Sequence, residues 1–133
     1  MIELAEIEAA RERIRGAALR TPLVRLYLDD AEPEIWCKLE TLQPIGSFKI
    51  RPVGNAVLAR PAASLAAGLY TCSSGNSAVA VAWLAQRLEV PATAVVTEAA
   101  PAAKIGRLRG VHLGERHGGH RVHHRVSQKG YMS

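Results

Sequence analysis

The 133-residue sequence is poor in aromatic side chains and in cysteine. Aromatics make up 5% of the chain, and its two cysteines are Cys37 and Cys72. Two cysteines are too few for a disulfide framework, so we expect reduced thiols and a cytoplasmic protein. No apolar run approaches the roughly 20 residues that span a bilayer, and the acidic, amphipathic start of the chain does not resemble a signal peptide. The sequence therefore predicts no membrane partner.

The net charge of +5 is confined to the end of the chain. Residues 1–105 carry 11 basic and 11 acidic side chains, whereas residues 106–133 carry 6 basic residues, 1 acidic residue and all five histidines. A nucleic-acid-binding domain would carry its charge on a folded face with aromatic rings for stacking, so nucleic acid is not the expected partner. No cysteine or carboxylate cluster completes a ligand set around the histidines, so we predict no metal site.

Apolar patterning predicts alternating helices and strands before residue 110. Alternation of this kind indicates an α/β fold in which parallel strands alternate with helices. Ser47 is a plausible N-cap for the second helix. The expected helices are 3–18, 47–60, 76–88 and 102–109, and the expected strands are 35–39, 69–72 and 93–97.

Lys49 is the first candidate for chemistry. It follows Gly46, Ser47 and Phe48 at the predicted start of a helix, where the helix dipole disfavours the ammonium form. A neutral lysine amine is what Schiff-base chemistry requires. The alternative interpretation is an ordinary solvated lysine on a surface helix.

A second candidate is the small polar turn between the strand over 69–72 and the helix over 76–88. Its sequence is Ser73-Ser74-Gly75-Asn76-Ser77. Backbone N–H groups at a helix start favour an anion, and open α/β sheets bind ligands at the carboxyl ends of their strands. Ordinary helix capping is the alternative.

These two segments stand among further motifs in a characteristic order. The others are Arg20-Thr21-Pro22-Leu23, Lys38-Leu39-Glu40, Gln43-Pro44-Ile45 and Val90-Pro91-Ala92. Together the motifs resemble the fold-type II pyridoxal-phosphate (PLP) enzymes, and most closely the threonine/serine dehydratases. The resemblance covers about 105 residues. It implies an incomplete α/β fold of the tryptophan synthase β type.

The resemblance also implies roles for individual residues. Lys49 would hold PLP covalently and serve as the catalytic base, and Phe48 would lie beside the cofactor ring. Asn76 would meet the 3'-oxygen of PLP. The substrate carboxylate would be held by Ser73, Ser74, Gly75 and Ser77. The implied reaction is β-elimination from a hydroxy amino acid, giving a 2-oxo acid and ammonia; threonine, serine and hydroxyaspartate all stay open as substrates.

The sequence departs from the family pattern in several places. Ser77 and Val79 stand where the family commonly has His and Gln. The glycine-rich phosphate loop and the partner of the pyridine nitrogen have no counterpart in this chain. We therefore expect residues 1–109 to be a partial dehydratase-like region that is inactive alone. Residues 110–133 are expected to be a disordered, basic, His/Gly-rich tail, produced by a shift in the reading frame.

Three alternatives stay open at this point. One is a β-replacement enzyme of the cysteine-synthase type, although Phe48 before Lys49 and Arg51 after it favour a dehydratase. Another is a serine racemase, which would share Lys49. The third is an inert fragment with a basic, His-rich binding tail. The sequence does not indicate an oligomeric state.

Overall fold

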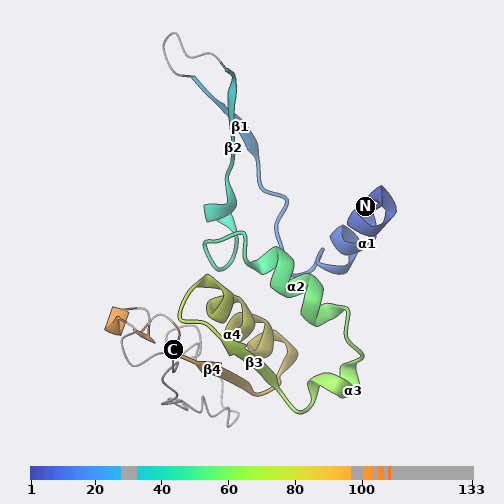
Figure 1. Cartoon of the computed structure of the whole chain (residues 1–133), viewed down its shortest axis with the longest axis vertical. Helices are drawn as coiled ribbons and strands as arrows, with labels where there is room; N and C mark the ends of the chain where they lie inside the picture. The colour runs from blue at the N-terminus through green and yellow to red at the C-terminus, as the bar shows by residue number, and fades with distance from the viewer. Residues whose placement is uncertain (28–32, 97–100, 104, 107, 109–133) are drawn as a thin grey trace, which may run out of the picture.

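A computed structural model describes residues 1–27, 33–96, 101–103, 105, 106 and 108 (Figure 1). The tail expected over 110–133 lies outside these residues. The residues that the structure describes within the helix expected over 102–109 are helical. The elements, in chain order, are α1 (Leu4–Arg13), β1 (Leu23–Leu26), β2 (Ile35–Lys38), the 3-10 helix η1 (Glu40–Leu42), α2 (Ile50–Leu58), α3 (Ala62–Leu65), β3 (Leu69–Cys72), α4 (Asn76–Leu88) and β4 (Ala92–Val95).

The strands β3 and β4 form a parallel pair joined by α4. Leu69 pairs with Ala92 at one end of the register, and Cys72 pairs with Val95 at the other. Parallel strands need a crossover connection, and the apolar residues of α4 let that helix pack back on both strands. The expected α/β class with parallel strands and helices is confirmed, and β3 and α4 have the bounds that the sequence predicted.

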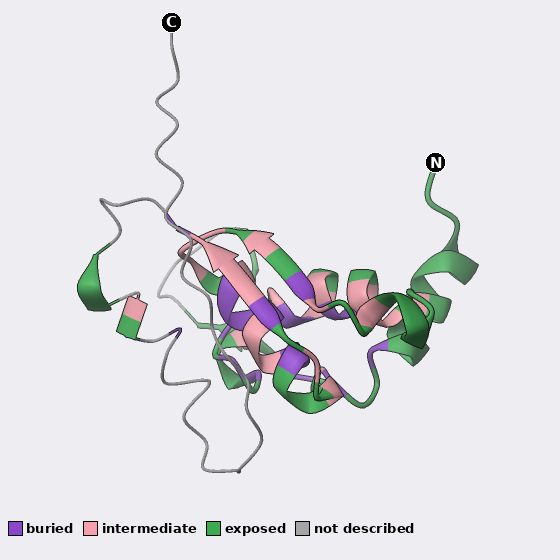
Figure 2. Ribbon diagram, turned by 90° about the horizontal axis from the view of Figure 1, so that it is seen from below, coloured by how far each residue is buried: buried purple, intermediate pink, exposed green. Residues whose placement is uncertain are grey.

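The hydrophobic core lies between α4, β3, β4 and α2. Ile50 and Leu84 are the largest fully buried side chains, at 0% and 1% exposure. Val53 and Val57 extend the apolar face of α2 against the same cluster. Figure 2 shows the buried residues gathered in this part of the molecule. The packing fixes the start of α2 relative to α4, which positions both candidate segments.

The strands β1 and β2 form an antiparallel hairpin that projects from the rest of the molecule (Figure 1). Only β2 was expected from the sequence. Leu23 pairs with Lys38 and Leu26 pairs with Ile35, and no residue of either strand is buried. Val24 and Leu26 point to one face together with their cross-strand partners, Cys37 and Ile35, because neighbouring residues alternate between faces. One face of the hairpin is therefore apolar.

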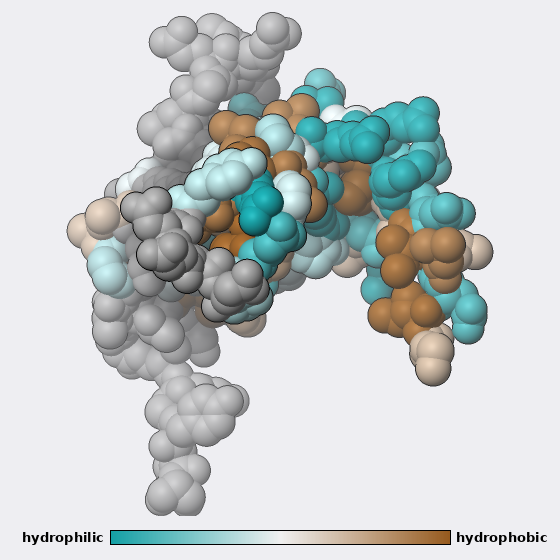
Figure 3. Space-filling model, turned by 90° about the horizontal axis from the view of Figure 1, so that it is seen from above, coloured by the Kyte–Doolittle hydropathy of each residue, from teal (hydrophilic) through white to brown (hydrophobic). Residues whose placement is uncertain are grey.

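The helix α1 is shorter than the predicted helix over 3–18. It ends at Arg13, and Ile14 leaves helical geometry with φ −93° and ψ 4°. Leu4 and Ile7 are 68% and 56% exposed, whereas Ile14 and Ala17, after the helix, are buried. Figure 3 shows apolar side chains on the surface at the end of the molecule where α1 lies. None of the described helices is long and apolar enough to cross a membrane.

The helix α2 starts later than the sequence predicted. Lys49, not Ser47, is the N-cap residue, and Ile50 is the first helical residue. Ser47 is 7% exposed and its Oγ accepts a hydrogen bond from the backbone N–H of Lys49 at 3.2 Å. Pro52 falls in the first turn, where a missing N–H costs no helical hydrogen bond, so the helix continues through it.

Candidate functional site

Lys49 lies between two buried residues at the start of α2. Ser47 lies two residues before it and Ile50 directly follows it, so packing holds the backbone on both sides. Its side chain is half-buried, and Nζ lies 4.9 Å from the centroid of the Phe48 ring. Phe48 itself is 52% exposed. The structure thus brings Lys49 and Phe48 together as a cation over an accessible ring.

The turn between β3 and α4 forms the other half of the site. Gly75 is the N-cap of α4, and no side chain caps this helix. The carbonyl of Gly75 accepts from the N–H groups of Ala78 and Val79, and Ser73 Oγ accepts from the N–H of Gly75 at 3.1 Å. Ser73, Ser74 and Ser77 are half-buried. The start of a 13-residue helix is suited to an anion, because the helix dipole is positive there.

The two halves of the site begin parallel neighbouring helices. α2 and α4 pack against each other, and in Figure 1 both start on the left of the molecule. Lys49 stands at the start of α2, and Asn76 is the first residue of α4. The structure thus places the Lys49 amine and the start of α4 on neighbouring helices.

A polar network that the sequence reasoning did not identify lies beside Lys49. The Glu40 carboxylate accepts hydrogen bonds from Arg51 Nε at 2.8 Å and Arg51 Nη2 at 2.7 Å, and from Thr21 Oγ1 at 2.6 Å. The bonds from Arg51 lower the pKa of Glu40 from its usual 4.5 to about 2, against the opposing effect of burial. The pKa of Arg51 is raised, chiefly by the same hydrogen bonds. The sequence did contain a signal for this network, because Glu40 and Arg51 both belong to the motifs on which the family resemblance rests.

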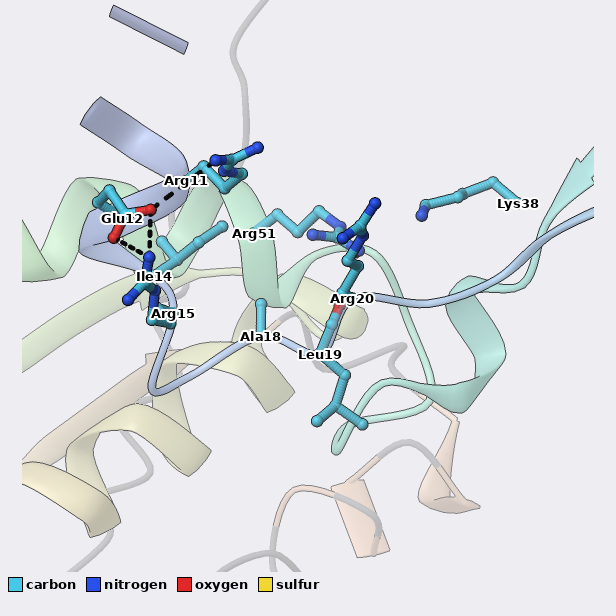
Figure 4. A pocket seen from close by; sticks show the side chains of 9 residues that line it. All are labelled: Arg11, Glu12, Ile14, Arg15, Ala18, Leu19, Arg20, Lys38 and Arg51. Atoms are coloured by element: carbon cyan, nitrogen blue, oxygen red, sulfur yellow. Dashed lines mark hydrogen bonds and ion pairs between the residues drawn. The ribbon is translucent and has the colours of Figure 1, made fainter. Parts of the chain in front are cut away.

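A cleft of about 610 Å³ lies on the side of this network that faces α1 (Figure 4). Neither Lys49 nor the turn at 73–77 lines it. Much of its charge is satisfied within the protein: Arg15 pairs with Glu12 at 2.5 Å, Arg51 pairs with Glu40, and Lys38 Nζ donates to the carbonyl of Thr21. The cleft is therefore separate from the candidate site, and Arg51 is the residue that links them. Its lining residues are Arg11, Glu12, Ile14, Arg15, Ala18, Leu19, Arg20, Lys38 and Arg51.

The part of the chain that the structure describes holds no group of three or more His, Cys, Asp or Glu residues placed to bind a metal ion. The histidines of the tail lie outside that part. The residues of the candidate site offer an amine, hydroxyl groups, an amide and backbone N–H groups.

The fold and the site agree with a match to one protein family. The family of pyridoxal-phosphate dependent enzymes matches residues 14–114, which include Lys49 and the turn at 73–77. The chain belongs to this family. The expected resemblance to PLP enzymes is confirmed.

Curated relatives carry the names of ammonia-lyases and dehydratases. The chain is 41% identical over 106 residues to an L-threo-3-hydroxyaspartate ammonia-lyase of Pseudomonas sp, with 78% of this chain and 33% of the relative covered. It is 35% identical over 113 residues to the L-threonine dehydratase catabolic TdcB of Staphylococcus aureus (strain N315), with 83% of this chain and 33% of the relative covered. The chain thus spans about a third of the length of these relatives.

Solved structures of the same fold include racemases and deaminases. A serine racemase of maize superposes with a TM-score of 0.78 at 30% identity, covering 95% of this chain and 37% of the racemase. A threonine deaminase of T.th. superposes with a TM-score of 0.76 at 34% identity, covering 96% of this chain and 38% of the deaminase. These superpositions confirm the fold-type II architecture, of which the chain forms a part.

Proposed function

We propose that this chain is the lysine-bearing part of a PLP-dependent ammonia-lyase that eliminates water from a hydroxy amino acid. The observation that carries the proposal is that Lys49, at the start of α2, and the start of α4 lie on the same side of two helices that pack together. The names of the curated relatives support the elimination of a β-hydroxyl group.

The residues present fit the cofactor's reactive end. Lys49 offers a half-buried amine for the aldehyde carbon of PLP, and Phe48 offers an aromatic face beside that amine. Asn76, at the start of α4, would bind the 3'-oxygen. The N–H groups and hydroxyls of the 73–77 segment would bind the substrate carboxylate.

Each residue then has a definite task in the reaction. PLP, when bound, withdraws electrons from the Cα of the substrate. The free amine of Lys49 would accept the Cα proton. The β-hydroxyl would leave as water, taking up overall the proton lost from Cα, and hydrolysis of the released product would give a 2-oxo acid and ammonia. The turn at Ser73–Ser77 fixes the substrate carboxylate and hence the orientation of the Cα–H bond.

Serine racemisation is the second candidate, because a serine racemase is a structural neighbour with a TM-score of 0.78. It would use the same proton transfer at Lys49, followed by return of a proton to the opposite face. The two reactions differ in product: elimination releases ammonia and a 2-oxo acid, and racemisation conserves the amino acid. We expect the protein to act in the cytoplasm, and we expect the 133-residue chain alone to give no turnover.

Attachment of PLP to Lys49 is the direct test. The sequence has four lysines, at positions 38, 49, 104 and 129, so each can serve as a control for the others. After incubation with PLP and reduction with borohydride, peptide mass spectrometry should find the cofactor chiefly on Lys49. Lys49→Ala should abolish the selective label and leave the labelling of the other three lysines unchanged. Equal labelling of all four lysines in the unmodified chain would overturn the proposal.

A further inference from the structure

Among the described residues, the Glu40–Arg51 pair stands out because its two side chains form hydrogen bonds both with each other and with several further residues. Arg51 reaches both carboxylate oxygens of Glu40, at 2.8 Å and 2.7 Å, and the two side chains are only 17% and 32% exposed, Glu40 being the less exposed. Hydrogen bonds between charged partners in a fork geometry are both stronger and more directional than neutral ones. The pair therefore fixes the orientation of the first turn of α2, where Arg51 is the second helical residue.

The pair is anchored in turn to two other segments. Gln43, 3% exposed, donates to Glu40 Oε2 at 3.2 Å and exchanges two hydrogen bonds of 2.9 Å with the backbone of Leu19. Arg51 Nη2 also donates to the carbonyl of Leu19 at 3.0 Å. Figure 4 shows the Arg51 side chain extending from α2 toward the segment that carries Leu19 and Arg20. Three segments distant in sequence are thus joined at Glu40.

Lys49 is close to this junction in the sequence. It lies two residues before Arg51, and its side-chain amine contacts the exposed ring of Phe48. An amine on a flexible four-carbon stem takes its position from the backbone that bears it when no charged partner holds it. The backbone of Lys49 is set by Ile50 in the core and by Arg51 in the network.

We propose that Glu40 is a positioning residue for Lys49. Through Arg51 it holds the first turn of α2, so that the amine of Lys49 keeps the one position in which it can attach PLP and take a proton. This assignment rests on the proposed function for its purpose, but the coupling between Glu40 and the Lys49 amine can be measured without cofactor.

The test compares Glu40→Gln and Arg51→Gln with a matched control, Glu34→Gln. Glu34 forms an ion pair of 2.9 Å with Arg25 on the exposed hairpin, where both side chains are more than 40% exposed. Limited reductive methylation with formaldehyde and cyanoborohydride, over a range of pH, gives the reactivity of each lysine by peptide mass spectrometry. Lys104 and Lys129 serve as internal references. Circular dichroism confirms that each variant is folded, with sucrose added where needed, since excluded osmolytes favour the compact state.

Both network variants should change the pH profile of Lys49 methylation relative to the reference lysines, and should lower PLP attachment at Lys49 by about tenfold, because small misplacements of a reacting group have large effects. The double variant should change the profile by less than the sum of the two single changes, since both variants break the Glu40–Arg51 pair while each also alters hydrogen bonds of its own. Glu34→Gln should leave Lys49 as in the unmodified chain.

The outcomes separate this inference from the proposed function. A folded Glu40→Gln or Arg51→Gln chain in which Lys49 keeps its original profile would overturn the positioning role, whatever happens with PLP. If the profile changes in both variants but the unmodified chain never attaches PLP at Lys49, the positioning role stands and the proposed function fails. If the pair had a purely structural role, Glu40→Gln and Arg51→Gln would lower the unfolding midpoint but would leave the reactivity of Lys49 in the folded chain unchanged.

Discussion

The β3–α4–β4 unit and the β1–β2 hairpin each contain two strands, but only the first of them encloses a hydrophobic core. In the parallel unit, α4 crosses over the strands and alone contributes six buried residues. In the two strands of the hairpin no residue is buried, and Leu23, Val24, Leu26 and Ile35 are all at least 40% exposed. An isolated two-stranded hairpin is marginally stable in water, because nothing covers its apolar face. The packed unit therefore supplies the rigid frame of the candidate site, and the hairpin and α1 do not.

The contrast between packed and exposed elements, which include α1 as well as the hairpin, predicts a large difference between Leu→Ala substitutions in α4 and in α1. Leu84→Ala should lower the free energy of unfolding by roughly 3–5 kcal/mol, because it leaves a cavity in the core at a residue that is 1% exposed. Leu4→Ala in α1, at a residue that is 68% exposed, should change it by less than about 0.5 kcal/mol. Urea unfolding followed by circular dichroism measures both. Equal effects would mean that α1 is as well packed as α4.

The Glu40–Arg51 pair, at the junction between the two parts, should make stability depend on pH. The pKa of Glu40 is about 2 in the folded chain, below its usual 4.5. Its contribution to the free energy of unfolding is therefore complete above pH 4.5 and is lost as the pH falls toward 2, roughly 1–2 kcal/mol in total after a discount for solvent screening.

The unfolding free energy of the unmodified chain should thus fall more steeply over this pH range than that of Glu40→Gln. Glu34→Gln, in an exposed ion pair, should follow the unmodified chain within about 0.5 kcal/mol. Parallel pH curves for Glu40→Gln and the unmodified chain would contradict a depressed pKa at Glu40. Urea titrations at closely spaced pH values supply the curves.

The smallest effect is expected at the end of α4. Glu89 caps this helix in the left-handed region, with φ 55° and ψ 36°. Glu89→Gly should stabilise the chain by about 0.5 kcal/mol, since glycine has no Cβ to strain there but loses more entropy on folding. Glu8→Gly, inside α1, should give no stabilisation, because it weakens a regular helix. A lower unfolding midpoint for Glu89→Gly would show that the Glu89 side chain has a favourable contact that outweighs the strain.

The sequence predicted the packed unit better than the hairpin for a physical reason. The strand over 69–72 and the helix over 76–88 have strong apolar patterns of their own, and both were found with the predicted bounds. The strand β1 has four residues and is defined by its pairing with β2, which no local pattern specifies. The helix over 3–18 was overestimated because Ile14 and Ala18 fit its spacing, yet Ile14 is buried and Ala18 half-buried by tertiary packing after the chain has left the helix.

In the candidate site, too, the sequence predicted some features correctly and missed others. Lys49 and the turn at 73–77 could be found because their residue types and spacing indicate chemistry. The role of Ser47 was predicted wrongly, since a serine before a helix is usually its cap, and here Ser47 is buried with its Oγ bonded to the N–H of Lys49. The links from Glu40 to Thr21 and Gln43 join separate segments, and only the folded chain brings them together.

Gln43 shows how a single side chain can substitute for a strand. Its amide oxygen accepts from the N–H of Leu19 and its amide nitrogen donates to the carbonyl of the same residue, both at 2.9 Å. This is the pair of hydrogen bonds that a neighbouring strand would offer. The backbone N–H of Leu19, although it belongs to no helix or strand, should therefore exchange with deuterated solvent as slowly as an amide inside a sheet.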